Sequence, residues 1–387
     1  MPIFIVIFLS FLALVNFYAG WRVIDRWPWA AQHPLLSYSI VLLVFVLQLV
    51  GPLGDRLVFQ TWRNKPVLGA LAEAADWVSY ITFGAVSILI ATAIVADIIT
   101  LIWKGVAPPA DTIDFARRTL LAMGAVTLIA TVLGIAQAHI LMSVKRVRIS
   151  LPNLPPQFEG FTIAQISDLH VGPTIRRGFV QQIVDKANAL KADMIALTGD
   201  FTDGGVEELA QHVAPLGQLQ APHGTFFITG NHEYFVDPQG WIGHFGKLGA
   251  RVLLNEHEVI RRDDDAIVVA GVTDYSTRGQ QGPHASSPQR ALDGAPEGLI
   301  QILLAHQPAS YVDASAAGFH LQLSGHTHAG QYFPFTLLIG LFQRYTAGLN
   351  RHENMWVYVN RGTGYWGPPL RTANLPEITL LTLTRAA

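Results

Sequence analysis

The chain contains no cysteine. This absence excludes disulfide bonds and metal sites built from thiolate ligands. It does not reveal the compartment, because a chain without cysteine is compatible with either side of a membrane.

Charged residues are also scarce. They make up 14% of the 387 residues, 50% of the chain is apolar, and the mean hydropathy is +0.32. A soluble domain usually carries about 25% charged residues, so part of this chain is expected to lie in lipid. The net charge is −2, and no segment is rich in lysine and arginine throughout. This balance argues against a nucleic-acid partner held through phosphate contacts.

Four apolar runs predict a transmembrane helical domain over residues 1–145. Each run is close to or longer than the roughly 20 residues that cross a hydrocarbon core of about 30 Å. The first run lacks a basic segment and a small-residue cleavage site, which favours an anchor over a signal peptide. Tryptophans at or between the ends of the runs fit the interfacial preference of indole rings. The alternative is a buried bundle of soluble helices. The runs cover residues 2–20, 36–53, 75–103 and 119–142.

These runs predict a multi-pass protein of the cell membrane with both termini on one side. That side would hold six cations near the spans and the other side five, so the positive-inside rule slightly favours a cytoplasmic C-terminal domain. The first run, which has cations only after it, favours the opposite orientation. The six cations are Arg56, Arg63, Lys65, Lys145, Arg146 and Arg148, and the five are Arg22, Arg26, Lys104, Arg117 and Arg118.

Two ionisable residues, Asp97 and His139, fall inside the predicted spans. An ionisable group within a membrane is a functional candidate. Both residues lie toward the interfacial end of a span, where water is within reach, so we expect a structural role for both.

The composition changes at residues 143–148, and Pro152, Pro155 and Pro156 then prevent a continuing helix. We interpret residues 146–160 as a linker and residues 161–387 as a second domain. Short apolar strands alternate there with amphipathic helices, which predicts an α/β layered domain with strands of mixed direction. Strands are expected over residues 161–167, 193–198, 225–229, 258–261, 267–272, 299–305, 319–323, 356–359 and 378–384, and helices over about 179–190, 206–219, 241–248 and from Pro308.

Five of these strands end in side chains that bind metals. In open α/β sheets, sites assemble at the carboxyl ends of the strands. Each residue also has a simpler interpretation: Asp168 could cap a helix, Asn231 could hold a turn and His306 could be a core histidine. Coincidence in five separate strands is implausible, so we expect a metal site. The strand ends supply Asp168 and His170, then Asp200 and Asp203, then Asn231 and His232, then His306, then His326 and His328.

This ordered series resembles the complete signature of the calcineurin-like metallophosphoesterases, from about residue 161 to the C-terminus. Residues 325–331 and 376–384 are similar to a membrane-associated bacterial branch, and the apolar runs resemble transmembrane proteins that carry such a domain. The resemblance implies a four-layer αββα sandwich with two divalent metal ions, which could be Mn²⁺, Fe²⁺/³⁺ or Zn²⁺. It implies that Asp168, His170 and His328 hold one ion, that Asn231, His306 and His326 hold the other, and that Asp200 bridges them.

The resemblance also implies a chemistry. A hydroxide between the two ions would attack the phosphorus ester in line with the leaving oxygen. His232 would protonate the leaving group, and Asp203 would orient its imidazole. Glu233, the next residue, is expected to be structural. The protein Ser/Thr phosphatases of this family have Arg-Gly after the aspartate that corresponds to Asp203, whereas this chain has Gly204-Gly205, so a protein phosphatase is not expected.

An apolar segment over residues 332–342 follows the last histidines. It is too short to span a bilayer and too apolar for an ordinary active-site loop. It either packs back into the domain or lies against the membrane or its helices, beside the metal site. The second possibility predicts a lipid-linked or amphiphilic substrate. The leading hypothesis is therefore a membrane-anchored phosphodiesterase or pyrophosphatase, and the alternative is a non-catalytic membrane scaffold or sensor that retains the metal-binding domain.

Overall fold

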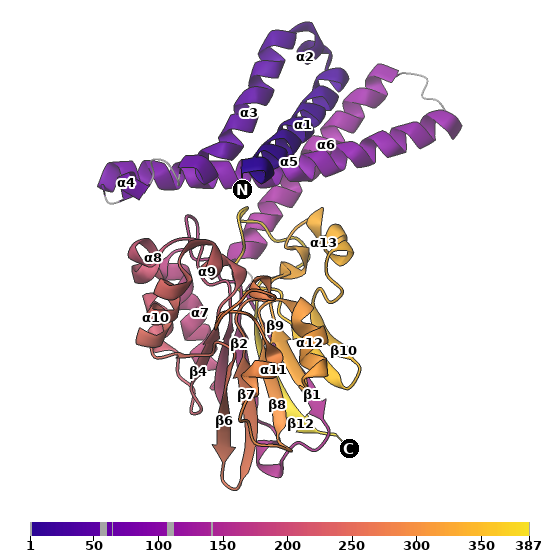
Figure 1. Ribbon diagram of the computed structural model, residues 1–387. Coiled ribbons are helices and arrows are strands. Elements are labelled where there is room, and N and C mark those ends of the chain that lie inside the picture. The colour runs from indigo at the N-terminus through magenta and orange to yellow at the C-terminus, as the bar shows by residue number, and fades with distance from the viewer. Residues whose placement is uncertain (1, 55–59, 64, 107–111, 141, 387) are drawn as a thin grey trace. The chain divides into compact units, whose positions relative to one another are not determined.

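The computed structural model describes residues 2–54, 60–63, 65–106, 112–140 and 142–386. The chain forms two compact units. The helical unit comprises residues 1–136 together with residues 367–372, and the α/β unit comprises residues 137–366 and 373–387. Figure 1 shows the helices of the first unit in indigo to magenta.

Three helices of the described chain are long and apolar enough to cross a membrane, over Pro34–Gly54, Val67–Trp103 and Ile113–Ile140. They coincide with three of the four predicted spans. The predicted first span lies within helix α1 and stays a prediction, and residue 141 of the last predicted span lies outside the described residues. The helices are α1 (Pro2–Arg26), α2 (Pro28–Gln32), α3 (Pro34–Gly54), α4 (Gln60–Arg63), α5 (Pro66–Val106) and α6 (Thr112–Ile140).

Helix α5 has 41 residues and is about 62 Å long, roughly twice the thickness of a hydrocarbon core. Residues 77–96 of this helix carry no charge, and a paired aspartate lies at each end of that stretch. Asp76 pairs with Arg63 at 2.9 Å. Asp97 accepts hydrogen bonds from Tyr18 at 2.7 Å and from the Nε of Arg22 at 3.0 Å, and it also pairs with Arg26. Asp97 thus has the structural role expected of it, since it joins α5 to α1.

The α/β unit contains two six-stranded sheets of mixed direction. In the first sheet the order is β1-β12-β2-β3-β4-β5, and β2 to β5 run parallel. In the second the order is β10-β11-β9-β8-β7-β6, and β7, β8, β9 and β11 run parallel. The strands are β1 (Ser143–Leu151), β2 (Thr162–Ile166), β3 (Met194–Thr198), β4 (Thr225–Ile228), β5 (Arg251–Val252), β6 (Glu256–Arg262), β7 (Asp265–Gly271), β8 (Ile300–Leu304), β9 (Leu321–Ser324), β10 (Gly348–His352), β11 (Met355–Val359) and β12 (Glu377–Arg385).

Alternation of side chains along the strands produces the predicted four layers. Ile163 and Ala196 face the second sheet, where they join a core that includes Ile302 and Leu323. Their neighbours Ala164 and Leu197 face the opposite way, toward a core covered by helices. Figure 1 shows helices on both outer faces. The first sheet is covered by α7 (Arg177–Ala189), α8 (Val206–Val213) and α10 (Pro238–Lys247), and the second by α11 (Pro288–Ala291) and α12 (Tyr311–Ala316).

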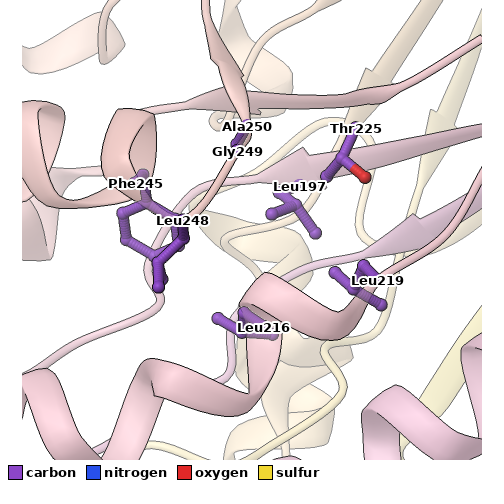
Figure 2. A pocket seen from close by; sticks show the side chains of 8 residues that line it. All are labelled: Leu197, Leu216, Leu219, Thr225, Phe245, Leu248, Gly249 and Ala250. Carbon is purple, nitrogen blue, oxygen red and sulfur yellow. The ribbon is translucent and has the colours of Figure 1, made fainter.

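A small cavity of about 20 Å³ lies in the layer between the first sheet and its helices. Figure 2 shows that its walls come mostly from apolar side chains, among them Leu197, Leu216 and Phe245. Its volume is about that needed by one water molecule, and its walls carry no ionisable group. It is therefore a packing defect and not a binding site for a substrate.

The predicted linker differs from the structure. Residues 143–151 form strand β1, which pairs in parallel with β12 along its whole length. Val147, Ile149 and Leu151 face the core at every second position, while Arg146 and Arg148 alternate with them. The sequence prediction treated the cations as the end of a membrane domain and overlooked their period of two. Only residues 152–161, with a short 3₁₀ turn over Pro156–Phe158, connect β1 to β2.

Candidate metal centre

The five predicted strand ends bring their side chains to one site. Strands β2, β3 and β4 are parallel neighbours in the first sheet, and β8 and β9 are parallel neighbours in the second. The buried side chain of Gln165 connects the two sheets there, because its Nε2 donates to the carbonyl of Ser324 and to Thr198 Oγ1, both at 2.9 Å. The residues that follow the five strands therefore surround one position between the sheets.

Asp168, His170 and His328 form the first group of donors. One donor atom from each lies within 4.8 Å of the others. His170 Nε2 is 3.0 Å from His328 Nε2, and His328 Nε2 is 3.5 Å from Asp168 Oδ1. All three residues are buried. Two imidazole nitrogens and a carboxylate oxygen at this separation form a set that a divalent metal can bind.

Asp200, His306 and His326 form the second group, again with one donor atom from each within 4.8 Å of the others. His306 Nε2 is 3.0 Å from Asp200 Oδ2. The other ring nitrogen of His306 is 2.8 Å from the carbonyl of Thr198, and this contact fixes the ring so that Nε2 faces the site. Asn231 begins helix α9 (Asn231–Val236) and is buried.

Asp200 lies between the two groups. Its Oδ2 is 4.0 Å from His170 Nε2, which belongs to the first group, and 4.0 Å from His232 Nε2. Its other oxygen accepts a hydrogen bond of 2.9 Å from the backbone N–H of His232. The buried carboxylate thus faces three imidazoles, those of His170, His232 and His306.

Asp203 contacts two imidazoles. Its Oδ1 is 2.8 Å from Nδ1 of His170 and 2.8 Å from Nδ1 of His232. Burial alone would raise the pKa of Asp203. The two imidazoles lower it by more than burial raises it, so the pKa of Asp203 lies below the usual range. Burial lowers the pKa of His232, but Asp203 more than offsets this and raises it to about 9. Sequence reasoning expected the contact with His232 and missed the contact with His170.

The backbone is strained where these ligands leave their strands. Asp168, His170, Asp200, His326 and His328 all have φ between 48° and 72°. This left-handed region is uncommon for residues other than glycine, and such strain persists where the surrounding structure enforces it. Glycines make room for the carboxylates: a Cβ at Gly230 would collide with Asp200, and a Cβ at Gly325 would collide with Asp168.

The fully buried Glu233 organises two ligand loops at once. Its Oε1 accepts backbone N–H groups of Phe201 at 2.7 Å and Thr202 at 3.2 Å, and its Oε2 accepts those of Asp200 at 3.0 Å and Gly230 at 2.7 Å. It therefore holds the loop after β3 against the loop after β4. This contact pattern agrees with the structural role that the sequence suggested.

Two buried oxygens at the site have no hydrogen-bond partner in the described part of the chain, Oδ2 of Asp168 and Oδ1 of Asn231. A buried acceptor without a partner is costly, and native structures rarely keep one without a reason. A cation satisfies both a carboxylate and an amide oxygen. The donor set therefore fits divalent metal ions.

Comparison with known proteins agrees with this geometry. Residues 161–330 match the family model of the calcineurin-like phosphoesterases. A "Transmembrane protein with metallophosphoesterase domain" from Danio rerio is 39% identical over 279 residues, which are 70% of this chain and 63% of that protein. An "Uncharacterized metallophosphoesterase" from Aquifex aeolicus is 30% identical over 266 residues, which are 66% of this chain and 97% of that protein. The chain belongs to the calcineurin-like phosphoesterase family.

The similarity to the animal relatives extends over part of their length. The alignment spans 63% of the Danio rerio protein and 61% of a protein of the same name from Bos taurus, which is 38% identical. These names and the apolar helices also show that the metallophosphoesterase described here is associated with a membrane.

Three arginines of the α/β unit have partners within the protein. Arg176 and Arg177 interact with α8 and its loop, through His212 Nε2 at 3.1 Å and the carbonyl of Gln211 at 2.9 Å. Arg361 lies 3.9 Å from the buried Glu377, and Arg371 belongs to the helical unit.

Two aromatic rings flank His232, and sequence reasoning missed both. Phe235 lies on the same helix, with its ring centroid 5.2 Å from that of the imidazole. Trp366 approaches from a distant part of the chain, with its ring at 5.7 Å and nearly perpendicular to the imidazole. The spacing of three residues between His232 and Phe235 on a helix could have revealed the first contact. No local signal reveals the second.

Proposed function

We propose that the protein is a membrane-anchored phosphoesterase with two metal ions, and that it hydrolyses a phosphodiester or pyrophosphate bond. The observation that carries this proposal is the pair of donor groups with Asp200 between them. A domain that had become a scaffold or sensor would be expected to lose donors, and here every position of the family signature is occupied by a suitable side chain.

In this proposal Asp168, His170 and His328 hold one ion, Asn231, His306 and His326 hold the second, and Asp200 contacts both. Oxygen and imidazole ligands suit Mn²⁺, Fe²⁺/³⁺ or Zn²⁺. Bound ions would lower the pKa of a water molecule and neutralise charge on the phosphoryl group.

His232 would supply the proton for the leaving group. Its Nδ1 is held by Asp203 at 2.8 Å, which leaves Nε2 directed toward Asp200 and the site. In the reaction, a water molecule gives up one proton to solvent as its oxygen forms a bond to phosphorus, the bond from phosphorus to the leaving oxygen breaks, and the proton on Nε2 moves to that oxygen. Asp203 keeps the imidazole oriented and favours its protonated form.

Replacing Asn231 by alanine tests this proposal. The wild-type protein with Mn²⁺ is expected to hydrolyse bis(4-nitrophenyl) phosphate. The variant is expected to be slower by at least about a hundredfold, because loss of a ligand weakens the binding of one ion and reduces the stabilisation of charge in the transition state. Release of 4-nitrophenolate measures the rate. Asn188→Ala, at the end of α7, is the matched control and should keep full activity. A wild-type protein that never turns over, or an Asn231 variant as active as the control, would favour the scaffold or sensor.

We further propose that the substrate is amphiphilic. The support comes from the apolar segment after the last metal-binding histidine, which contains helix α13 (Phe335–Leu338) and a 3₁₀ turn over Ile339–Leu341. Tyr332 packs into the domain, but Leu337, Leu341 and Phe342 are 73%, 77% and 79% exposed. The segment stays beside the site, because Gly330 closely approaches the backbone of Phe335. Such a surface suits the apolar part of a lipid-linked phosphoester.

Exchanging Leu337, Leu338 and Leu341 together for serine tests the amphiphilic substrate. Hydrolysis of a phosphodiester with a long alkyl chain should fall by about tenfold or more, because the variant buries roughly two fewer methylene groups of the chain. The variant and the wild-type protein should hydrolyse bis(4-nitrophenyl) phosphate at similar rates. Initial rates for the two substrates are compared on one preparation. Val312→Ser, an exposed apolar residue on α12, is the control. Equal losses for both substrates would contradict the proposal.

We also propose that the protein crosses the membrane several times, with its catalytic domain in the cytoplasm. Three apolar helices and a further long helix, α1, support an even number of spans. An even number places both termini on one side. The slight excess of cations on that side supports the cytoplasm, although one of them, Arg56, lies outside the described residues.

A further inference from the structure

Phe235 and Trp366, which we call the aromatic collar, are exposed although they are among the most apolar side chains of the domain. Phe235 is 70% exposed and Trp366 is 56% exposed. Each ring nevertheless contacts His232, with centroid distances of 5.2 and 5.7 Å. Two large rings that keep contact with one imidazole and face water on their other side leave an apolar surface open at the site.

The backbone of Trp366 is held in place by a buried glutamine. Gln331 Oε1 accepts the backbone N–H of Trp366 at 2.9 Å, and Gln331 Nε2 donates to the backbone carbonyl of the same residue at 3.1 Å. Gln331 itself has a φ of 55°, a left-handed value, and directly follows the turn over His328–Gly330. The loop that carries a metal-binding histidine thus also positions Trp366.

The apolar segment begins directly after Gln331, the residue that binds the backbone of Trp366. Tyr332, the next residue, packs its ring against Phe335 at 5.3 Å, and Phe335 starts α13. The exposed Val236 follows Phe235 on α9. Gln331 therefore connects Trp366 to the segment that carries the exposed leucines of α13.

We infer that the aromatic collar binds the leaving group, and that this leaving group is the part of the substrate that carries an alkyl or isoprenoid chain. This inference rests on the proposed function, in which His232 Nε2 delivers a proton to the leaving oxygen. Whatever is bonded to that oxygen must lie next to His232, and the apolar side chains that contact His232 are Phe235 and Trp366. The retained side of the phosphoester lies on the metal-binding side of the site, among charged and polar groups.

The test uses two isomeric phosphodiesters that differ only in the position of an octyl chain. Methyl (4-octyl-2-nitrophenyl) phosphate carries the chain on the leaving phenol, and octyl (4-methyl-2-nitrophenyl) phosphate carries it on the retained alcohol. The leaving phenols have similar acidity, so intrinsic reactivity is matched. With full-length protein and Mn²⁺, kcat/KM is expected to be about tenfold higher for the first isomer. This factor corresponds to burying roughly two methylenes of the octyl chain against the collar.

The ratio of the two kcat/KM values is then measured in collar variants. Both isomers are assayed on one preparation, so any loss of folded protein cancels in the ratio. Trp366→Ala and Phe235→Ala are expected to bring the ratio to within about twofold of one, because the apolar surface beside His232 is removed. Phe235→Leu keeps an apolar side chain and should keep most of the preference, and Val312→Ala is the control away from the site.

Equal rates for the two isomers in the wild-type protein would overturn the inference, and so would a preference for the chain on the retained side. A wild-type preference that survives in both alanine variants would also overturn it. A third substrate without the octyl chain, methyl (4-methyl-2-nitrophenyl) phosphate, distinguishes failure of the collar inference from failure of the proposed function. If the wild-type protein hydrolyses that diester but does not distinguish the isomers, the collar inference alone is wrong. If it hydrolyses none of the three, the proposed function is wrong and the inference falls with it.

Discussion

Replacing Asp200 by asparagine is expected to lower kcat/KM for bis(4-nitrophenyl) phosphate by at least about a thousandfold, because several kcal/mol of transition-state stabilisation are lost. The reason is the position of this carboxylate between the two donor groups. Its Oδ2 lies 3.0 Å from His306 Nε2 and 4.0 Å from His170 Nε2. A neutral amide in this place cannot balance the charge of two cations, so both the affinity for the metal ions and the rate of hydrolysis should fall.

Asparagine is the informative replacement because it keeps the shape of the side chain. Its Oδ1 can still accept the backbone N–H of His232, as the carboxylate does at 2.9 Å. The loss in rate should therefore reflect the missing charge rather than unfolding. Thermal unfolding of the metal-free proteins checks this, since wild type and variant should have similar midpoints. Asp185→Asn, an exposed position on α7, is the matched control. An Asp200 variant that retains wild-type turnover would exclude the proposed mechanism.

Replacing Glu233 by alanine is expected to destabilise the α/β unit by about 3–5 kcal/mol, the cost of leaving buried groups without their charged partner. Four backbone N–H groups donate to this carboxylate, those of Asp200, Phe201, Thr202 and Gly230. The thermal midpoint should fall by roughly 10 °C. Intrinsic tryptophan fluorescence of the full-length protein follows the transition.

Glu233→Gln should lower the stability of the α/β unit nearly as much as Glu233→Ala. This result would show that both carboxylate oxygens of Glu233 are needed as acceptors. Each carboxylate oxygen accepts two backbone N–H groups, and glutamine offers one oxygen and one NH₂ group. The NH₂ group would face two donors and could satisfy neither. Glu207, an exposed glutamate in the first turn of α8, provides the matched control Glu207→Gln. Midpoints of both Glu233 variants close to that of the control would contradict the structural role of Glu233.

The convergence of the candidate ligands could be predicted from the sequence because of one property of parallel sheets. Strands that run in the same direction end at the same edge, so Asp168, Asp200 and Asn231 had to emerge together once their strands were recognised. His306 and His326 follow two parallel strands of the second sheet in the same way. The apolar runs of the helical unit were equally visible, because a span must be long and apolar.

Other features depend on contacts that no local pattern encodes. Residues 143–151 form a strand because β12, more than 200 positions away, pairs with them. Trp366 reaches His232 because Gln331 holds its backbone, and these three residues lie in different parts of the chain. Asp203 contacts His170 as well as His232 only once the loops after β2 and β3 have folded against each other. Such contacts belong to tertiary packing and become visible only in the structure.

The count of metal ions per chain tests the central claim most directly. Protein loaded with Mn²⁺ and dialysed against metal-free buffer is analysed by inductively coupled plasma mass spectrometry, beside the Asp200→Asn variant. We expect close to two Mn²⁺ per wild-type chain and fewer in the variant. A folded wild-type protein that retains no metal, or a variant that retains as much as the wild type, would contradict the account.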